Sequence, residues 1–230
     1  MNYIGSKFSL LDFLRGGDAA AFRERMEELR EHYPAPAYYG AMNFLSTHDT
    51  PRILTLLGHE GDAPATRDER AAYLLSEEEK SRGTALLKLA ALILYTFPGS
   101  PMLYYGDEAG MQGFEDPFNR GPYPWGHEDT ALLRYFRQLG ALRKAHEALQ
   151  RGTIDYCAAQ GRVLAFRRAS NSEKSITAVN AGEQSAALTL PWDAPLAQDA
   201  LTRQSFFCGD GLLRLTLEPY GAVLLIEPEN

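Results

Sequence analysis

An imidazole and a carboxylate stand side by side at the end of a short apolar run. The run Ala-Met-Asn-Phe-Leu covers residues 41–45, His48 and Asp49 follow shortly after it, and Arg52 stands three residues further on. A neutral imidazole can donate a hydrogen bond and a carboxylate accepts several, so the pair suits the hydroxyl groups of a polar ligand. The alternative is structural: Asp49 caps a following helix and His48 is a polar loop residue.

A second pair of opposite charges follows another short apolar run. Residues 102–108 read Met-Leu-Tyr-Tyr-Gly-Asp-Glu, and further on Asp116 precedes Arg120 by four residues in Asp-Pro-Phe-Asn-Arg. A carboxylate acceptor and a forked guanidinium donor suit two neighbouring hydroxyl groups, although the same spacing occurs in ordinary surface ion pairs. In parallel α/β folds, function sits at the carboxyl ends of strands, which favours a binding role for His48 and Asp49.

The elements that would position these residues change in character along the chain. Asp18 followed by apolar residues at helical spacing predicts a helix over residues 18–32, and a nearly all-apolar segment predicts a buried helix over 82–97. Residues 41–46 and 102–108 are predicted strands. From Gly152 onward about seven short runs with a period of two predict a small antiparallel β-sandwich. The fold class is therefore α/β plus all-β, with domains at 1–149 and 150–230.

The composition of the chain restricts the classes of molecule that it is expected to bind. The 230 residues carry a net charge of −7, and 45% are hydrophobic. The absence of a block of basic residues argues against nucleic acid and anionic membrane surfaces as partners. The longest apolar stretch is shorter than the roughly 18 residues of a membrane span, and no export signal is visible, so we expect a cytoplasmic location. Cys157 and Cys208 read as ordinary thiols, and neither a metal site nor a cofactor is predicted.

Two segments resemble one enzyme family closely. Asn-Phe-Leu-Ser-Thr-His-Asp-Thr-Pro-Arg, residues 43–52, looks like the signature at the end of barrel strand seven in the alpha-amylase family of glycoside hydrolases. Residues 97–125 are similar to the strand-eight segment of its neopullulanase, cyclomaltodextrinase and maltogenic amylase branch. The likeness implies the C-terminal portion of a TIM (β/α)8 barrel, strands seven and eight with their helices, and then the family's all-β domain.

The resemblance implies a role for each candidate residue. Asp49 would be the transition-state stabiliser, and His48 would donate a hydrogen bond to a hydroxyl of the same sugar. Asp116 and Arg120 would bind the next sugar unit. Arg52 is assigned either to the substrate or to support of the loop after strand seven. The implied reaction is retaining hydrolysis of α-1,4 bonds, with α-1,6 bonds as a further candidate, in maltodextrin, cyclodextrin or pullulan.

The resemblance to this family also shows that two of its catalytic segments are missing from the sequence. The family's nucleophile lies in a Gly-Phe-Arg-x-Asp segment and its general acid follows strand five, and neither context occurs in these 230 residues. We therefore expect the chain alone to be inactive. Its expected partners are an α-glucan, the missing N-terminal part of the barrel, and a second copy through exposed barrel strands. The alternatives are a non-catalytic amylase-like binding or interaction module and one chain of a split enzyme.

Overall fold

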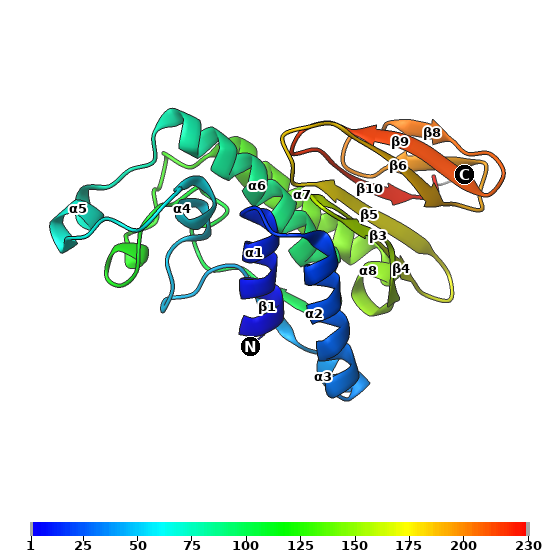
Figure 1. The fold of residues 1–230 in the computed structure, drawn as a ribbon, viewed down its shortest axis with the longest axis horizontal. Coiled ribbons are helices and arrows are strands. Elements are labelled where there is room, and N and C mark those ends of the chain that lie inside the picture. The colour runs from blue at the N-terminus through cyan, green and yellow to red at the C-terminus, as the bar shows by residue number, and fades with distance from the viewer. Residues whose placement is uncertain (1, 229–230) are drawn as a thin grey trace.

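A computed structural model describes residues 2–228, with helices dominating the first two thirds and antiparallel strands the last third (Figure 1). The helical elements are η1 (Tyr3–Ser9), α1 (Leu10–Leu14), α2 (Ala19–His32), α3 (Ala35–Tyr39), α4 (Ile53–Gly58), α5 (Arg67–Ala72), α6 (Glu77–Thr96), η2 (Phe118–Arg120), α7 (Thr130–Ala145) and α8 (Glu147–Arg151). The strands are β1 (Met42–Phe44), β2 (Ser100–Met102), β3 (Thr153–Gln160), β4 (Val163–Ala169), β5 (Lys174–Asn180), β6 (Ala186–Pro191), β7 (Leu196–Asp199), β8 (Ser205–Phe207), β9 (Leu212–Leu217) and β10 (Ala222–Ile226).

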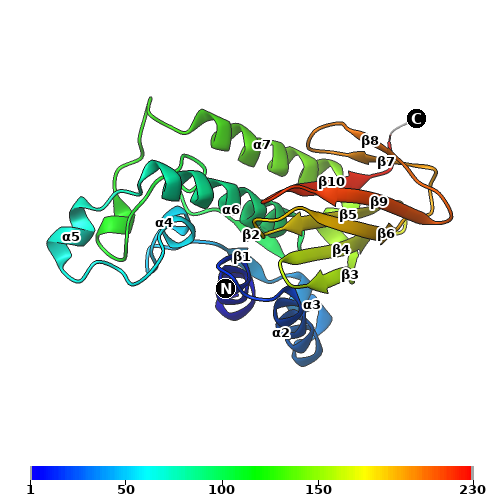
Figure 2. The ribbon, with the colours of Figure 1, turned by 45° about the horizontal axis from the view of Figure 1, so that its top comes forward.

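Helix α6 is the central element of the helical part. Its apolar half is buried as the sequence predicts, and it lies between α7 and the strand pair β1–β2 (Figure 2). The helix begins five residues before the predicted segment. Ser76 accepts a hydrogen bond from the backbone N–H of Glu79, whose side chain accepts one from Ser76 N–H, and this reciprocal cap starts the helix within a polar stretch.

The two short strands near the candidate residues pair in parallel. Met42 lies opposite Ser100 and Phe44 opposite Met102, so both strands end at the same edge. The predicted strand over 102–108 is wrong in its bounds, because β2 covers only Ser100–Met102. A turn follows in which Asp107 N–H donates to Tyr104 C=O at 3.2 Å. The acids after β2 therefore lie in a loop beyond the strand.

The antiparallel part has two sheets. One has the strand order β3-β4-β5-β10-β7-β8, and the other is the pair β6-β9. Leu190, Trp192 and Leu213, from the smaller sheet and its loop, join Ile176 and Leu225 of the larger sheet in one hydrophobic cluster. A core shared between two antiparallel sheets agrees with the predicted sandwich.

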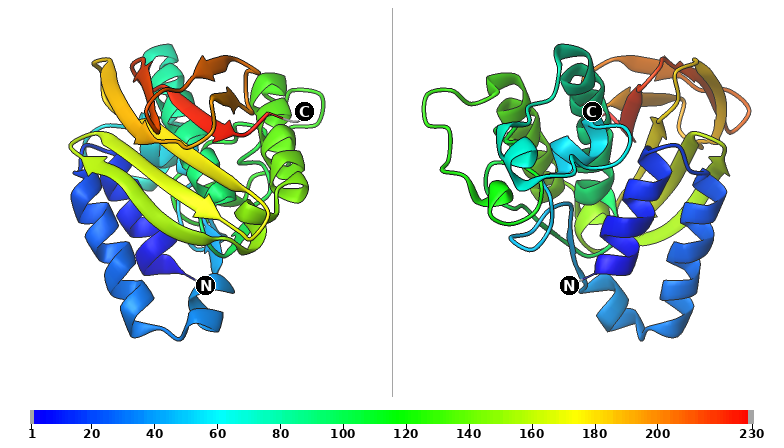
Figure 3. Two further views of the ribbon diagram at one scale, coloured as in Figure 1. Left: turned by 90° about the vertical axis from the view of Figure 1, so that its right-hand side faces the viewer. Right: turned by 60° about the vertical axis from the view of Figure 1, so that its left-hand side comes forward.

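A second hydrophobic cluster joins the strands to the helices. The cluster that contains the buried side of α6 also contains Leu164, Phe166 and Leu224 from the large sheet. Helices α1 and α2 stand side by side next to the first strands of that sheet (Figure 3). The expected division between residues 149 and 150 falls inside α8, at the point where this continuous core passes from helices to strands.

Candidate functional site

His48 and Asp49 lie in the turn that follows β1. His48 Nε2 is 3.1 Å from Asp49 Oδ1, and both side chains are about 60% exposed. The turn is held by Thr47 Oγ1, which accepts a hydrogen bond from Asp49 N–H at 3.2 Å. Helix α4 begins only at Ile53, whose N–H donates to Ser46 Oγ at 2.9 Å. Ser46, and not Asp49, therefore satisfies the start of this helix, and the carboxylate of Asp49 is open to a ligand.

Arg120 joins the loop after β2 to the turn after β1. Its Nε is 2.7 Å from Asp116 Oδ1 and donates to His48 C=O at 3.2 Å. One terminal nitrogen lies 4.0 Å from Asp49 Oδ1. The surface ion pair that the spacing allowed is present, but its guanidinium also contacts both residues of the first pair. The structure thus brings His48, Asp49, Asp116 and Arg120 into one exposed cluster.

Asn119 is a buried residue that fixes the backbone of the turn carrying His48 and Asp49. Its buried Nδ2 donates to the C=O of His48 at 2.9 Å and of Thr50 at 2.8 Å. An amide that bridges two carbonyls of a tight turn fixes the direction in which the turn presents its side chains. The sequence analysis missed Asn119, although its place beside Arg120 in the same segment is a local signal of a structural role.

Arg52 is buried beneath the loop after β2 and is not part of the exposed cluster. Its side chain has no exposed surface; it donates to Tyr105 C=O and lies 3.3 Å from Asp107 Oδ1. The guanidinium carbon also stands over the rings of Tyr104, at 4.3 Å, and Tyr105, at 4.6 Å. A side chain enclosed in this way cannot contact a ligand at the strand ends. Of the two roles considered for Arg52, substrate contact is therefore corrected in favour of support for the loop.

Lys7 is a buried cation that the sequence did not reveal. Its Nζ donates to Leu45 C=O at 2.9 Å and to Thr50 Oγ1 at 2.7 Å, directly behind the His48–Asp49 turn. Burial lowers the pKa of Lys7 to about 8, while the nearby carboxylate of Asp107 opposes this shift. Lys7 lies 38 residues before Leu45, and only the folded chain brings them together. It adds a third anchor to the turn.

Asp107 should make stability depend on pH. Burial raises the pKa of Asp107 from its ordinary 3.8 to about 6, although hydrogen bonds from Ser46 and Arg52 favour the ionised form. The folded chain then binds more protons than the unfolded chain between about pH 4 and pH 6, so the stability contributed by this group is lost as pH rises through that window. In Asp107→Asn this dependence should disappear. Urea denaturation at several pH values measures the free energy of unfolding of both proteins. The prediction is contradicted if this free energy changes with pH equally in the wild type and in Asp107→Asn.

A recess shares Asp116 with the cluster. Its volume is about 430 Å³, and its walls combine Arg67 and Arg70 of α5 with Glu115, Asp116 and Phe118. Arg70 is ion-paired to Glu115 and also donates to Pro64 C=O at 2.6 Å. Helix α5 thereby extends the polar surface that begins at Asp49.

Neither a metal centre nor a membrane span is evident in the part of the chain that the structure describes. Over residues 2–228, the structure brings no three His, Cys, Asp or Glu side chains together as metal ligands. None of the helices in that range is both long and apolar enough to cross a bilayer. Cys157 and Cys208 are unpaired thiols, and burial raises the pKa of both.

Known proteins share both parts of this chain. Residues 16–125 match the catalytic domain of alpha amylase, and residues 158–224 match the C-terminal domain of maltogenic amylase. A cyclomaltodextrinase of Geobacillus thermopakistaniensis (strain MAS1) is 32% identical over 231 residues, which cover 97% of this chain and 35% of that protein. An amylopullulanase of Thermoanaerobacter thermohydrosulfuricus is 40% identical over 151 residues, covering 66% of this chain and 10% of that protein.

The fold has relatives among solved structures. A cyclomaltodextrinase structure superimposes with a TM-score of 0.80 at 26% identity, covering 99% of this chain and 36% of that one. The chain thus spans only about a third or less of the length of these relatives. The matched domains, the sequence relatives and the shared fold together show that the chain belongs to the alpha-amylase family.

Proposed function

We propose that the chain supplies part of the sugar-binding surface of a retaining glycoside hydrolase that acts on α-glucans. In this proposal β1 and β2 are the seventh and eighth strands of a (β/α)8 barrel, and the strands from β3 onward form its C-terminal domain. Strands one to six would come from sequence outside these 230 residues. The names cyclomaltodextrinase and amylopullulanase, carried by relatives, support an α-glucan as the substrate class.

The observation that carries the proposal is the bridging guanidinium of Arg120. It links the loops after two parallel strands, within reach of Asp49 and Asp116 at 4.0 Å and 2.7 Å. The carboxyl ends of parallel barrel strands are where active sites of this architecture lie. A surface ion pair alone would not require contacts with His48 and Asp49 as well.

Each side chain has a proposed task in the reaction. Asp49 accepts hydrogen bonds from hydroxyls of the sugar whose bond is broken, and these bonds strengthen as the ring approaches an oxocarbenium-like transition state. His48 donates a hydrogen bond to the same ring. Asp116 and Arg120 hold the next glucose unit by an acceptor and a donor. Binding energy from that unit then helps to orient the reacting ring.

The chain by itself should bind sugar without cleaving it. Retaining hydrolysis needs a nucleophilic carboxylate and an acid about 5–5.5 Å apart, and neither motif occurs in the sequence. Incubation with maltotriose should therefore release no reducing sugar above a protein-free blank, whereas titration calorimetry should detect saturable binding. If the chain hydrolysed maltotriose and Asp49→Asn abolished this activity, the proposal that the nucleophile and the acid lie outside these 230 residues would be refuted. Absence of binding would remove the carbohydrate function altogether.

The same measurements separate the alternatives. A non-catalytic binding module would also bind without turnover, but adding the N-terminal barrel segment of a relative would not restore hydrolysis. Restored hydrolysis would support either the parent enzyme or a split enzyme. Both of these require that Asp49 and Arg120 complete an active site made by other strands.

Self-association is a further proposal for the isolated chain. Ile4 and Phe8 on η1, Met42 of β1 and Leu103 after β2 are exposed apolar side chains. Barrel strands normally pack against neighbours on both sides, and uncovered strands tend to pair with other chains. Light scattering should show a mass that rises with concentration, and a double variant Phe8→Ser, Leu103→Ser should reduce the rise. A constant monomer mass up to high concentration would refute the proposal.

A further inference from the structure

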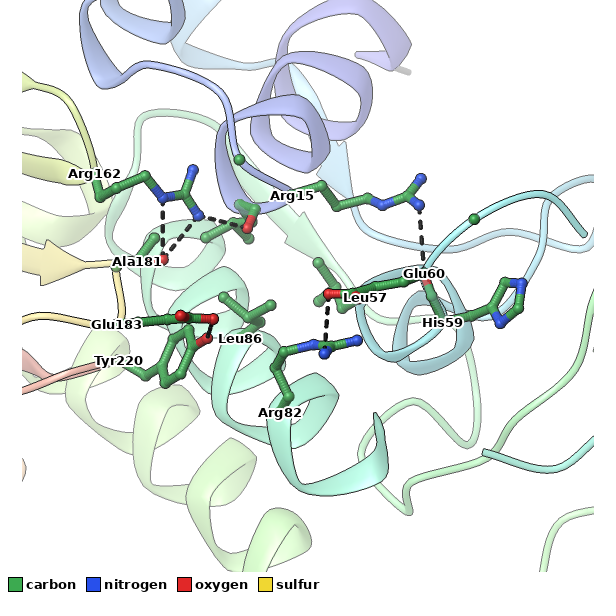
Figure 4. Close-up of a pocket in the computed structure, with 14 residues that line it drawn as sticks. Arg15, Leu57, His59, Glu60, Arg82, Leu86, Arg162, Ala181, Glu183 and Tyr220 are labelled. Atoms are coloured by element: carbon green, nitrogen blue, oxygen red, sulfur yellow. Dashed lines mark hydrogen bonds and ion pairs between the residues drawn. The ribbon is translucent and has the colours of Figure 1, made fainter. Parts of the chain in front are cut away.

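A second polar pocket lies where the helical part meets the strands. Its volume is about 540 Å³, within the range of roughly 300–1,000 Å³ typical of small-molecule sites. Its lining comes from the ends of α1 and α4, from α6, and from loops of the β-domain (Figure 4). None of its lining residues belongs to the His48–Arg120 cluster.

The pocket combines an apolar floor with polar side walls. Leu14, Leu57 and Leu86 form its base but are only 1–4% exposed, so the half-buried ring of Tyr220 supplies the larger apolar surface, with charged side chains around it (Figure 4). Tyr220 has a φ of 54°, a left-handed conformation that residues with side chains rarely adopt. Tyr220 occupies the third position of a tight turn in which Gly221 N–H donates to Glu218 C=O at 2.8 Å, and this turn presents its ring to the pocket. Here the Tyr220 hydroxyl donates to Glu183 Oε1 at 3.2 Å.

Charged groups of both signs in the pocket still have hydrogen-bonding positions to offer a ligand. Within residues 2–228 the structure gives Arg15 one long hydrogen bond, to His59 C=O at 3.4 Å, and its exposed guanidinium lies at the pocket with donors to spare. Glu183 bonds only the Tyr220 hydroxyl among the contacts the structure gives, and Glu60 is 76% exposed beside Arg82 at 2.9 Å. The pocket therefore offers both open donors and open acceptors.

The other cations are already engaged. Arg162 donates to the C=O groups of Phe13, Leu14, Gly17 and Ala181, which fastens the end of α1 to the β-domain. Arg82 donates to Gly58 C=O at 2.6 Å and pairs with Glu60. The lining thus sets three arginines against two glutamates, so the opposite charges nearly balance. Because Arg82 and Arg162 already donate to backbone carbonyls, few donors remain to surround a multivalent anion, which favours a neutral ligand.

We propose that this pocket is a second sugar-binding site, which holds a pyranose unit of a neutral oligosaccharide. A pyranose has an apolar face and a rim of hydroxyls that both donate and accept, which matches the half-buried ring of Tyr220 bordered by Arg15 and Glu183. The pyranose assignment rests on the pocket, whereas the choice of an α-glucan rests on the proposed function. The site would hold one part of a long chain while the His48–Arg120 cluster holds another.

The test separates the two sites within one protein. The full 230-residue chain is titrated with maltotriose while backbone amide signals are followed by NMR. Signals of residues 14–16, 57–61, 181–183 and 220 should shift saturably, and they should still do so in a His48→Ala, Asp49→Asn double variant. Arg15→Met and Glu183→Gln should each weaken this binding about tenfold, as expected for a lost hydrogen bond to a charged group. Arg25→Met, which alters an exposed arginine on α2, should leave it unchanged.

Three results would overturn the proposal. The first is maltotriose shifts confined to residues 47–50 and 116–120. The second is unchanged affinity at the pocket in both Arg15→Met and Glu183→Gln, each compared with the wild-type fold by circular dichroism. The third is tighter binding of inorganic phosphate than of maltotriose at these residues. Shifts at the pocket without any at residues 47–50 would support this site while refuting the proposed function of the cluster.

Discussion

Replacing Arg168 by leucine is expected to destabilise the chain by about 3–5 kcal/mol, the largest stability effect we predict for a single substitution, because each buried acceptor left unsatisfied costs about 1–3 kcal/mol. The side chain is fully buried, and its guanidinium donates to the backbone carbonyls of Thr96, Leu149, Gly152 and Thr153. These carbonyls belong to the end of α6, to α8 and the residue after it, and to the first residue of β3. Leucine would leave several buried acceptors without a donor just where the helices join the sheet.

The neighbouring arginine provides the control. Arg167 has a 39% exposed side chain and makes an ion pair with Asp155 at 3.0 Å. Exposed pairs of this kind contribute about 0–1 kcal/mol, so Arg167→Leu should cost far less than Arg168→Leu. Urea denaturation followed by circular dichroism measures both free energies of unfolding. Equal losses for the two variants would show that Arg168 does not hold the junction.

Replacing Arg120 by methionine is expected to weaken maltotriose binding at the cluster about 10- to 100-fold with little change in stability. The substitution keeps an unbranched chain of similar length but removes the guanidinium that contacts Asp116, His48 C=O and Asp49. Hydrogen bonds to charged groups are worth about 1.5–3 kcal/mol, which corresponds to this range of affinity. Because Arg120 is about half exposed, its removal leaves little buried surface uncovered.

Calorimetric titration gives the affinity, and thermal unfolding gives the stability. Arg25→Met is the matched control, because Arg25 is similarly exposed and forms an ion pair three residues along its helix with Glu28 at 2.5 Å. The control should bind maltotriose as the wild type does. Unchanged binding in Arg120→Met would mean that the bridge between the two loops is an ordinary surface contact. A large loss of stability would instead assign Arg120 a structural role.

Local patterns predicted much of the secondary structure. Asp18 does cap α2, where it accepts a hydrogen bond from Ala20 N–H at 2.7 Å, and the apolar segment within α6 is buried as expected. Strands β7 and β8 were missed, because each is short and they are separated by polar turn residues with no sustained alternation. The recess walled by α5 was also missed, since its residues carry no periodic signal that points toward Asp116.

The sequence by itself determined the family likeness, the main helices, the antiparallel domain and the identity of the four polar residues at the strand ends. These features depend on periodicity, caps and short motifs that lie within a few residues of one another. Only the tertiary structure decided that Arg120 joins both loops, that Arg52 is enclosed by Tyr104 and Tyr105, and that Lys7 braces the turn from 38 residues away. Such contacts depend on how whole elements pack, and a charged side chain looks the same in the sequence whether it is buried or free.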